Sequence, residues 1–403
     1  MPAPNPSAAL AEIQGLYGPF TFSEMLLQKI WAQGDYEPTQ LRTTDGRRVR
    51  VLQPGRWNRL GGPDFKSARL QLGDGPVQEA DVELHLRAED WQAHGHARDP
   101  AYHRVALHVV LFPPASSHVT HGGDGRDIPV LPLLPALRHD LEEYAAEEAV
   151  ENLANRPAAR VRELLGRLPP DTLELRLRAE AQRRWEQKVH FAAARVRKLG
   201  WTEACHQTAL EILGYRFNRV PMLRIAAEHP LAAWRHLPDG EIERIRQEPE
   251  LVWTLSGVRP ANHPRHRLHQ YAAWVRQSPE WPERLRTAAG QLTEISPEES
   301  TREQRRAARF PACRSRFAVL VCGGAVGGTR LDTLVCDGFL PLLAGDGTPG
   351  LAGWWYHWFP GDLPANFVQA LRQAGVFVRG TAPVCHGMVQ GLIGWLLAQD
   401  ADA

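Results

Sequence analysis

Apolar and polar side chains alternate along several short stretches in the first third of the chain, and this pattern predicts β-strands. The predicted strands cover residues 65–72, 82–86 and 105–111, with a further strand near 130–134. The strand over 105–111 is apolar on both faces, which predicts a central place in its sheet. The second predicted strand is amphipathic: its apolar side chains are Val82, Leu84 and Leu86, and its polar side chains are Glu83, His85 and Arg87. Successive side chains of a strand point to opposite faces. We therefore expect the apolar set in a core and the polar set together on the other face.

A helical pattern precedes these strands. Apolar residues recur at helical spacing over residues 22–31, Thr21 or Ser23 is placed to cap the helix, and Gly34 ends it. Glu24 lies in the first turn, where the helix dipole favours a carboxylate. The sequence thus predicts a capped helix immediately before the strands.

The order of the predicted elements defines the domains and the fold class. Residues 1–20 are rich in proline and alanine and are predicted to form a flexible N-terminal arm. Helix, strands, a short helical segment and a last strand predict an α/β domain over residues 21–136. Helical periodicity then predicts a helical domain over 137–308 and a mostly helical C-terminal region over 309–403, packed on the rest. The expected fold class is an α/β core followed by a large α-helical region.

Composition limits the partners and the cell compartment expected for the protein. The 403 residues include 47 basic and 46 acidic side chains, so no overall field favours nucleic acid or a membrane. The N-terminus lacks a signal-peptide pattern, and the longest apolar run, over residues 317–326, is too short to span a bilayer. Five cysteines without a short repeated spacing fit a reducing compartment. We therefore expect a cytoplasmic protein with no membrane part.

Carboxylates and imidazoles concentrate among the predicted strands. Asp64 precedes the first strand, and Glu83 and His85 share one face of the second. Unpaired charges beside apolar strands are costly, so a bound cation would explain this concentration. Two further histidines, His94 and His96, are interpreted as ligands of a metal or phosphate at the edge of a cleft. The alternative is a local network with nearby aspartates that fixes the loop.

The sequence Pro63-Asp64, followed by Glu83-Leu84-His85, resembles the motif of the PD-(D/E)XK nuclease superfamily, which is Pro-Asp followed by Asp/Glu-x-Lys. The resemblance implies a restriction-endonuclease-like core and a cation, Mg²⁺ or Mn²⁺, held by Glu24, Asp64 and Glu83. It also implies that Asp64, Glu83 and His85 are catalytic.

His85 stands where the superfamily has lysine. A neutral imidazole would orient or deprotonate water or bind the metal, and it favours Mn²⁺ over Mg²⁺. Arg87, His94 and His96 are then expected to contact phosphate.

A second resemblance covers nearly the whole chain. The uncharacterised bacterial domain-of-unknown-function 2851 family is similar to the segments FSEMLLQKIW, GGPDF, DVELHLRAEDWQAHGHARDPAYHRVALHVV, LGYRFNRVP and GVRPANHPRHRL. It implies no established activity. Members carry a cysteine-rich C-terminus, where this chain has only Cys385-His386, with Cys313, Cys322 and Cys336 upstream. These four lack C-x₂-C spacing, so a zinc site and simple burial of the thiols both stay open.

Three functions follow from these patterns. The first is metal-dependent hydrolysis of phosphodiester bonds in DNA or RNA, by the residues named above. The second is a catalytically inactive nuclease fold that binds nucleic acid or acts as a scaffold. The third is a metal-dependent hydrolase of a small phosphorylated substrate. A run of basic side chains between residues 156 and 198 is either a solvated helix face or a surface that follows phosphates.

Overall fold

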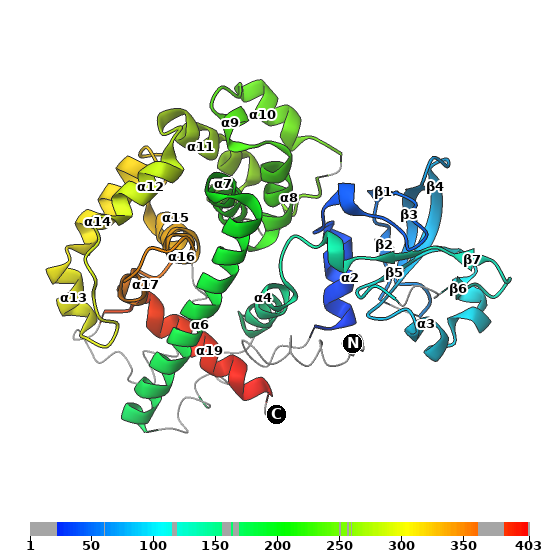
Figure 1. Ribbon diagram of the computed structural model, residues 1–403, viewed down its shortest axis with the longest axis horizontal. Helices are drawn as coiled ribbons and strands as arrows, with labels where there is room; N and C mark the ends of the chain where they lie inside the picture. The colour runs from blue at the N-terminus through cyan, green and yellow to red at the C-terminus, as the bar shows by residue number, and fades with distance from the viewer. Residues whose placement is uncertain are drawn as a thin grey trace, which may run out of the picture. The chain divides into compact units, whose positions relative to one another are not determined.

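The computed structural model describes residues 22–401, apart from positions 60, 115–118, 155–162, 164–168, 250, 256–257, 259 and 362–382. The predicted arm over residues 1–20 lies outside the described residues. The chain divides into two compact units, and the boundary between them lies after Glu148. We call residues 20–148 the sheet unit and residues 149–403 the helical unit (Figure 1).

The sheet unit contains a capped helix, a mixed sheet and several short turns of helix. Its elements are α2 (Glu24–Gln33), η1 (Pro38–Gln40), β1 (Val49–Gln53), β2 (Arg56–Trp57), β3 (Phe65–Leu72), β4 (Gln78–His85), α3 (Asp90–Ala93), η2 (His96–Arg98), η3 (Pro100–Tyr102), β5 (Val105–Val110), β6 (Thr120–His121), β7 (Asp127–Ile128), β8 (Val130–Pro132) and η4 (Leu134–Ala136). Helix α4 (Leu141–Ala154) runs across the boundary between the units.

The predicted helix before the strands is confirmed with both of its ends. The backbone N–H of Leu26 donates to the Ser23 hydroxyl at 3.2 Å, which satisfies one of the free amides of the first turn. Gly34 ends α2 in the left-handed region, with φ +68°. Glu24 is the acidic residue of the first turn, as expected.

The main sheet follows the strand order β1-β3-β4-β5-β8, with β2 also paired to β3. Strands β1, β3 and β4 are antiparallel neighbours, whereas β5 is parallel to both β4 and β8. The strand over residues 65–72 is confirmed to the residue, and the others agree within a few positions. Strand β4 begins earlier than predicted, at Gln78, because backbone pairing with β3 continues into exposed polar positions that carry no apolar alternation.

The core of the sheet unit lies on one face of the sheet. Val82, Leu84 and Leu107 are almost completely buried there, together with Trp31 of α2 and Tyr144 of α4. The predicted alternation in β4 is therefore confirmed. Burial of large side chains on this face stabilises the unit by roughly 1.5–3 kcal/mol for each fully buried one.

The second unit is helical, as the periodicity after residue 137 predicts. Its elements are α6 (Pro170–Leu199), α7 (Trp201–Leu213), α8 (Tyr215–Glu228), α9 (Leu231–Trp234), α10 (Asp239–Arg246), η5 (Pro260–Asn262), α11 (Pro264–Gln277), α12 (Trp281–Ala289), α13 (Thr301–Ala307), α14 (Phe310–Arg316), η6 (Phe317–Val321), α15 (Gly328–Thr333), η7 (Leu334–Phe339), α16 (Leu340–Gly345), α17 (Ala352–His357) and α19 (His386–Ala401). Two of these, η6 and η7, are π-helical. In the described part of the chain, every helix is too short or too polar to cross a bilayer.

Helix α19 packs directly against the long helix α6 (Figure 1). The approach is close because glycines face α6. A Cβ atom added at Gly391 would overlap the carbonyl oxygen of Leu177, and one at Gly394 would lie 3.0 Å from the Glu180 Cβ. The contact therefore depends on the absence of side chains at these positions.

We expect Gly391→Ala to destabilise the helical unit by about 1–3 kcal/mol, because the added methyl group forces α19 away from α6. Gly240→Ala in α10 is the matched control. It adds a methyl group to a helix at an exposed position with nothing within 4 Å. That variant should be stabilised by about 0.4–1 kcal/mol. Denaturant unfolding measures both changes, and equal effects of the two substitutions would contradict the packing described.

Candidate functional site

The polar face of β4 is buried in the middle of the sheet. Glu83 is 5% exposed and His85 is 1% exposed, and both point away from the apolar core. His108 on β5 is completely buried and is the register partner of Glu83 in the parallel pairing. An acid and two imidazoles thus share a water-poor region, where they need polar partners.

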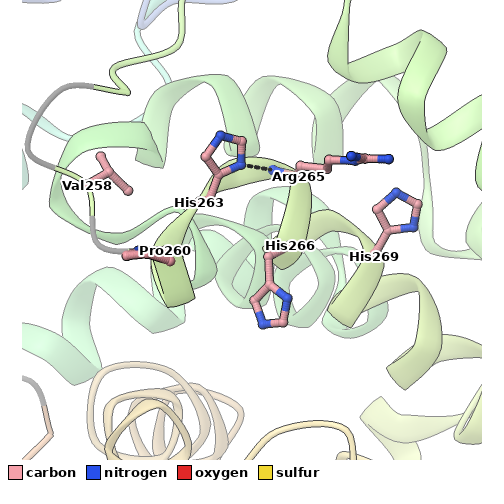
Figure 2. A pocket seen from close by; sticks show the side chains of 6 residues that line it. All are labelled: Val258, Pro260, His263, Arg265, His266 and His269. Atoms are coloured by element: carbon pink, nitrogen blue, oxygen red, sulfur yellow. Dashed lines mark hydrogen bonds between the residues drawn. The ribbon is translucent and has the colours of Figure 1, made fainter.

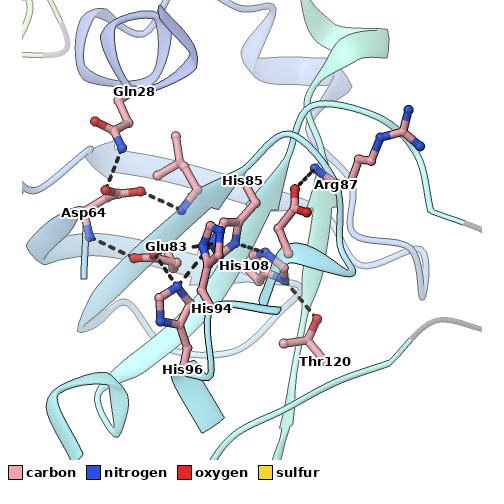
Figure 3. Close-up of polar contacts among 11 residues, drawn as sticks. Gln28, Asp64, Glu83, His85, Arg87, His94, His96, His108 and Thr120 are labelled. Carbon is pink, nitrogen blue, oxygen red and sulfur yellow. Dashed lines mark hydrogen bonds and ion pairs between the residues drawn. The ribbon is translucent and has the colours of Figure 1, made fainter. Parts of the chain in front are cut away.

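His85 meets two further imidazoles that come from the segment after β4 (Figure 3). Its Nε2 lies 3.1 Å from Nδ1 of His94 and 3.2 Å from Nε2 of His96. The donor atoms of these three side chains all lie within 4.8 Å of one another. We call His85, His94 and His96 the histidine cluster. Glu83 adjoins it, with Oε1 3.2 Å from His96 Nε2 and 3.7 Å from His85 Nε2.

The backbone between α3 and η2 brings His94 and His96 to His85. Gly95 lies between them in the left-handed region, with φ +74°, which glycine adopts without strain. The buried Trp91 anchors the segment, because its Nε1 donates to the carbonyl oxygen of His121 at 3.0 Å. The Tyr102 ring stacks on the His96 ring at a centroid distance of 4.0 Å. Two aromatic residues thus restrict the position of His96.

A second row of contacts lies behind His85. Its Nδ1 is 2.9 Å from Nε2 of His108, and Nδ1 of His108 is 2.9 Å from the Thr120 hydroxyl oxygen. A neutral imidazole has one donor and one acceptor nitrogen. If His108 donates to Thr120, its Nε2 accepts from Nδ1–H of His85. We assign these tautomers from the hydrogen-bond network, and they leave a lone pair on Nε2 of His85.

His85 is neutral at physiological pH. Burial, with the neighbouring His108, His96 and His94 acting in the same direction, lowers its pKa to about 2. His85 therefore differs from the lysine of the resembled motif in charge as well as in shape. It supplies a lone pair and no permanent positive charge.

Two hydrogen bonds, each between a carboxylate and a backbone amide, join Asp64 to Glu83 and to the next residue of β4, Leu84. The N–H of Asp64 donates to Oε2 of Glu83 at 2.9 Å, and the N–H of Leu84 donates to Oδ2 of Asp64 at 3.0 Å. Gln28 of α2 also donates to Oδ1 of Asp64, at 2.6 Å. Trp57 donates in turn to Oε1 of Gln28 at 3.1 Å, which orients that amide. The two acids therefore lie side by side.

Their proximity changes their ionisation. Burial, together with the negative charges of Glu83 and Glu24, raises the pKa of Asp64 to about 7, against the opposing hydrogen bonds from Leu84 and Gln28. Burial also raises the pKa of Glu24, whereas His94 and a hydrogen bond from the Leu86 amide lower it. Three acids that repel one another in this way favour a proton or a cation between them.

The predicted site residues are brought together to different degrees. Glu24, Asp64, Glu83 and the histidine cluster interact with one another directly or through their charges. Arg87 points elsewhere: its guanidinium carbon lies 5.9 Å from the centre of the Phe112 ring, away from the histidines (Figure 3). The contacts of Arg87, His94 and His96 with phosphate stay a prediction.

The residues that hold the site in place were not predicted from the sequence. Gln28 lies one helical turn after Glu24, so its presence on the same face of α2 was available from the spacing. Tyr102 and Trp91 are simple packing residues in the sequence, yet they contact His96. Thr120 carries no sequence pattern that connects it with His108.

Two other features of the described residues were considered as binding sites, the cysteines and a pocket in the helical unit. The five cysteines are free and buried, and Cys313, Cys322, Cys336 and Cys385 do not form a group close enough to share an ion. A pocket of about 670 Å³ in the helical unit is lined by Val258, Pro260, His263, Arg265, His266 and His269 (Figure 2). Arg265 and His269 both contact Glu243, which offsets their charge.

Several basic side chains of α6 form ion pairs within the helical unit. The ion pairs join Arg178 to Glu174, Arg183 to Glu180, Lys188 to Asp337 and Arg195 to Glu211. Arg156, Arg160, Arg162 and Arg167 lie outside the described residues. The described part of the basic stretch thus resembles a helix face with intramolecular partners.

Comparison with known proteins identifies the sheet unit and the first helices of the helical unit. A family model described as a protein of unknown function (DUF2851) matches residues 24–245, more than half of the chain. The matched range contains every residue of the histidine cluster and of the acidic pair. No curated protein and no solved structure gives a match.

The raised pKa of Asp64 predicts the pH dependence of stability in chelator-treated protein. A group whose pKa is higher in the folded state stabilises the fold below its ordinary pKa, near 3.8, and this stabilisation is lost as pH rises through about 7. The melting temperature should therefore fall between pH 5 and pH 8. Glu83→Gln should reduce that fall, because it removes one negative charge beside Asp64.

Glu89→Gln, which neutralises an exposed carboxylate near the same strand, is the control and should leave the pH profile unchanged. Carbon-13 NMR of labelled aspartate gives the pKa of Asp64 directly. An identical pKa in the wild-type protein and in Glu83→Gln would refute the coupling.

Proposed function

We propose that this chain, which belongs to the DUF2851 family, is a metal-dependent hydrolase of phosphodiester bonds. The observation that carries the proposal is that the carboxylates of Asp64 and Glu83 lie close together beside a neutral His85. Adjacent carboxylates bind hard divalent cations through oxygen. A bound cation lowers the pKa of a coordinated water molecule and stabilises the charge that develops on phosphate.

The arrangement of the sheet unit also supports a restriction-endonuclease-like core. Helix α2 precedes three antiparallel strands, β1, β3 and β4, and the next long strand, β5, is parallel to β4. The resembled superfamily has the same order of helix, three strands, helix and strand. Its second helix corresponds here to the short α3 and the turns η2 and η3. Asp64 and Glu83 occupy the positions of its two acids.

In this proposal the chain's own residues have distinct tasks. Glu83, Asp64 and Glu24 supply oxygen ligands for Mg²⁺ or Mn²⁺. Gln28 and the Leu84 amide hold the Asp64 carboxylate in place. The neutral His85 orients water or binds the metal, and the scissile phosphate lies on the side of the exposed His94.

Charge favours a second candidate, a hydrolase of a small phosphorylated substrate. The sheet unit carries more acidic than basic side chains, which disfavours attraction of a long polyanion. Several of the described basic groups of α6 are engaged with acids of the same unit. A small substrate needs the same metal ligands without an extended basic surface.

Cleavage assays separate these functions. With Mn²⁺ or Mg²⁺ present, the protein should hydrolyse labelled DNA or RNA, and Asp64→Ala and Glu83→Ala should each lower the rate at least ~100-fold by removing metal ligands. Asp74→Ala, which removes an exposed carboxylate from the turn between β3 and β4, should leave the rate unchanged. Circular dichroism shows whether each variant is folded.

Other outcomes are equally informative. Hydrolysis of bis(p-nitrophenyl) phosphate without cleavage or competition by nucleic acid identifies the small-substrate hydrolase. Salt-sensitive nucleic-acid binding that is indifferent to both substitutions, without cleavage, identifies an inactive binding protein. Cleavage that persists in both variants places the reaction elsewhere in the chain.

A further inference from the structure

We infer that Glu83, His85, His94 and His96 form a binding site for a first-row divalent transition metal, with Zn²⁺ as its representative. The donor atoms are Nε2 of His85, Nδ1 of His94, Nε2 of His96 and Oε1 of Glu83. This inference deepens the proposed function of the same site by changing its metal. Metal binding can nevertheless occur and be tested without catalysis.

The spacing of the donor atoms fits a single ion. A tetrahedral ion with bonds of about 2.0–2.1 Å holds its ligand atoms about 3.3 Å apart, and an octahedral one holds them about 2.9 Å apart. Nε2 of His85 lies 3.1 Å from His94 Nδ1, 3.2 Å from His96 Nε2 and 3.7 Å from Glu83 Oε1. Glu83 and His96 are 3.2 Å apart. The three imidazole nitrogens therefore already approach the shell of an ion, and Glu83 Oε1 adjoins two of them.

More atoms crowd around Nε2 of His85 than one hydrogen bond requires. In the assigned tautomer this nitrogen carries a lone pair, and it faces two imidazole nitrogens and a carboxylate oxygen at once. The lone pair accepts one well-aligned hydrogen bond, for example from Nδ1–H of His94, and the other two atoms then approach it without a hydrogen bond to it. A cation between the four side chains would instead bind the ring nitrogens and the carboxylate oxygen together.

The residues around the four proposed ligands make contacts of the kind that hold metal ligands in place. Ligating histidines donate their second N–H to a polar partner, which fixes the ring and its tautomer. His108 and Thr120 provide this for His85. The Asp64 amide holds the other oxygen of Glu83, and Tyr102 stacks on His96. Each of these contacts restrains a proposed ligand.

The donor set discriminates between metals. Three imidazole nitrogens and one carboxylate suit Zn²⁺ and its neighbours in the first transition row, whereas Mg²⁺ prefers oxygen ligands and retains its waters. Three of the four ligands are largely buried, but His94 is exposed, so an ion can enter from its side. Substrate or water can reach the metal by the same route.

Zinc binding to the full-length protein tests this site. After chelation and dialysis, titration against a competing zinc indicator should give about one tight equivalent per chain. His94→Ala, His96→Ala and Glu83→Gln should each weaken this binding at least ~100-fold, more than the loss typical of a residue outside the ligand shell. His103→Ala, an exposed histidine of the adjacent turn, is the matched control and should bind as the wild type does.

His94 is exposed, so its replacement should not disturb the fold, and circular dichroism checks this. Cobalt provides an independent readout, because Co²⁺ in a nitrogen-rich site of low coordination number gives intense visible absorption. Titration with Mg²⁺ should not displace it. Absence of tight Zn²⁺ binding, or binding equal to wild type in both His94→Ala and His96→Ala, would overturn the inference.

The role of His108 as a positioning residue has its own test. His108→Phe removes the acceptor behind His85 and should weaken Zn²⁺ binding by about 10–100-fold without changing the shape of the Co²⁺ spectrum. His108→Gln retains an acceptor oxygen and should recover most of the affinity. Equal affinities in the two variants would refute this role.

Failure of this inference and failure of the proposed function are distinguishable. Tight Zn²⁺ binding without any phosphodiester hydrolysis would keep the metal site and reject the hydrolase. Hydrolysis that depends on Mg²⁺ and on Asp64, with no Zn²⁺ binding, would keep the hydrolase and reject the histidine site.

Discussion

Burial of polar side chains in the centre of the sheet is the constraint on which the site depends. Glu83, His85 and His108 lie on β4 and β5 with almost no access to water. Such groups remain stable only when hydrogen bonds, protons or ions replace their lost hydration. The Asp64 amide, the Thr120 hydroxyl and the histidines after β4 are the replacements that the fold supplies.

The two halves of the site replace the lost hydration in different ways. On the side of α2, Asp64 and Glu83 are held by amide donors, and their mutual repulsion leaves Asp64 with a pKa of about 7. On the other side, ring nitrogens of His94 and His96 lie about 3 Å from Nε2 of His85. Glu83 belongs to both halves, since each of its oxygens faces one of them. A cation beside Glu83 would reduce the repulsion between the acids, and it would bind the ring nitrogens that lie close to one another.

The helical unit contributes differently to the proposed functions. Its basic helix α6 is tied to acids of the same unit and to α19 through close glycine contacts. Those interactions explain many of its charges as elements of helix packing. The chemistry proposed here therefore rests on the sheet unit, and the family match covers that unit together with the helices up to residue 245.

The sequence by itself determined the capped helix α2, the strands, the apolar face of β4 and the shared polar face of Glu83 and His85. These features depend on local periodicity and on neighbouring residues, so they can be predicted from one chain. Proximity of Asp64 to Glu83 followed only from a resemblance, and the supporting residues Gln28, Trp57 and Thr120 were not predicted. The tertiary structure alone decided that His94 and His96 reach His85. Their position depends on the backbone turn at Gly95 and on the packing of Trp91 and Tyr102, which are contacts between segments that periodicity does not relate.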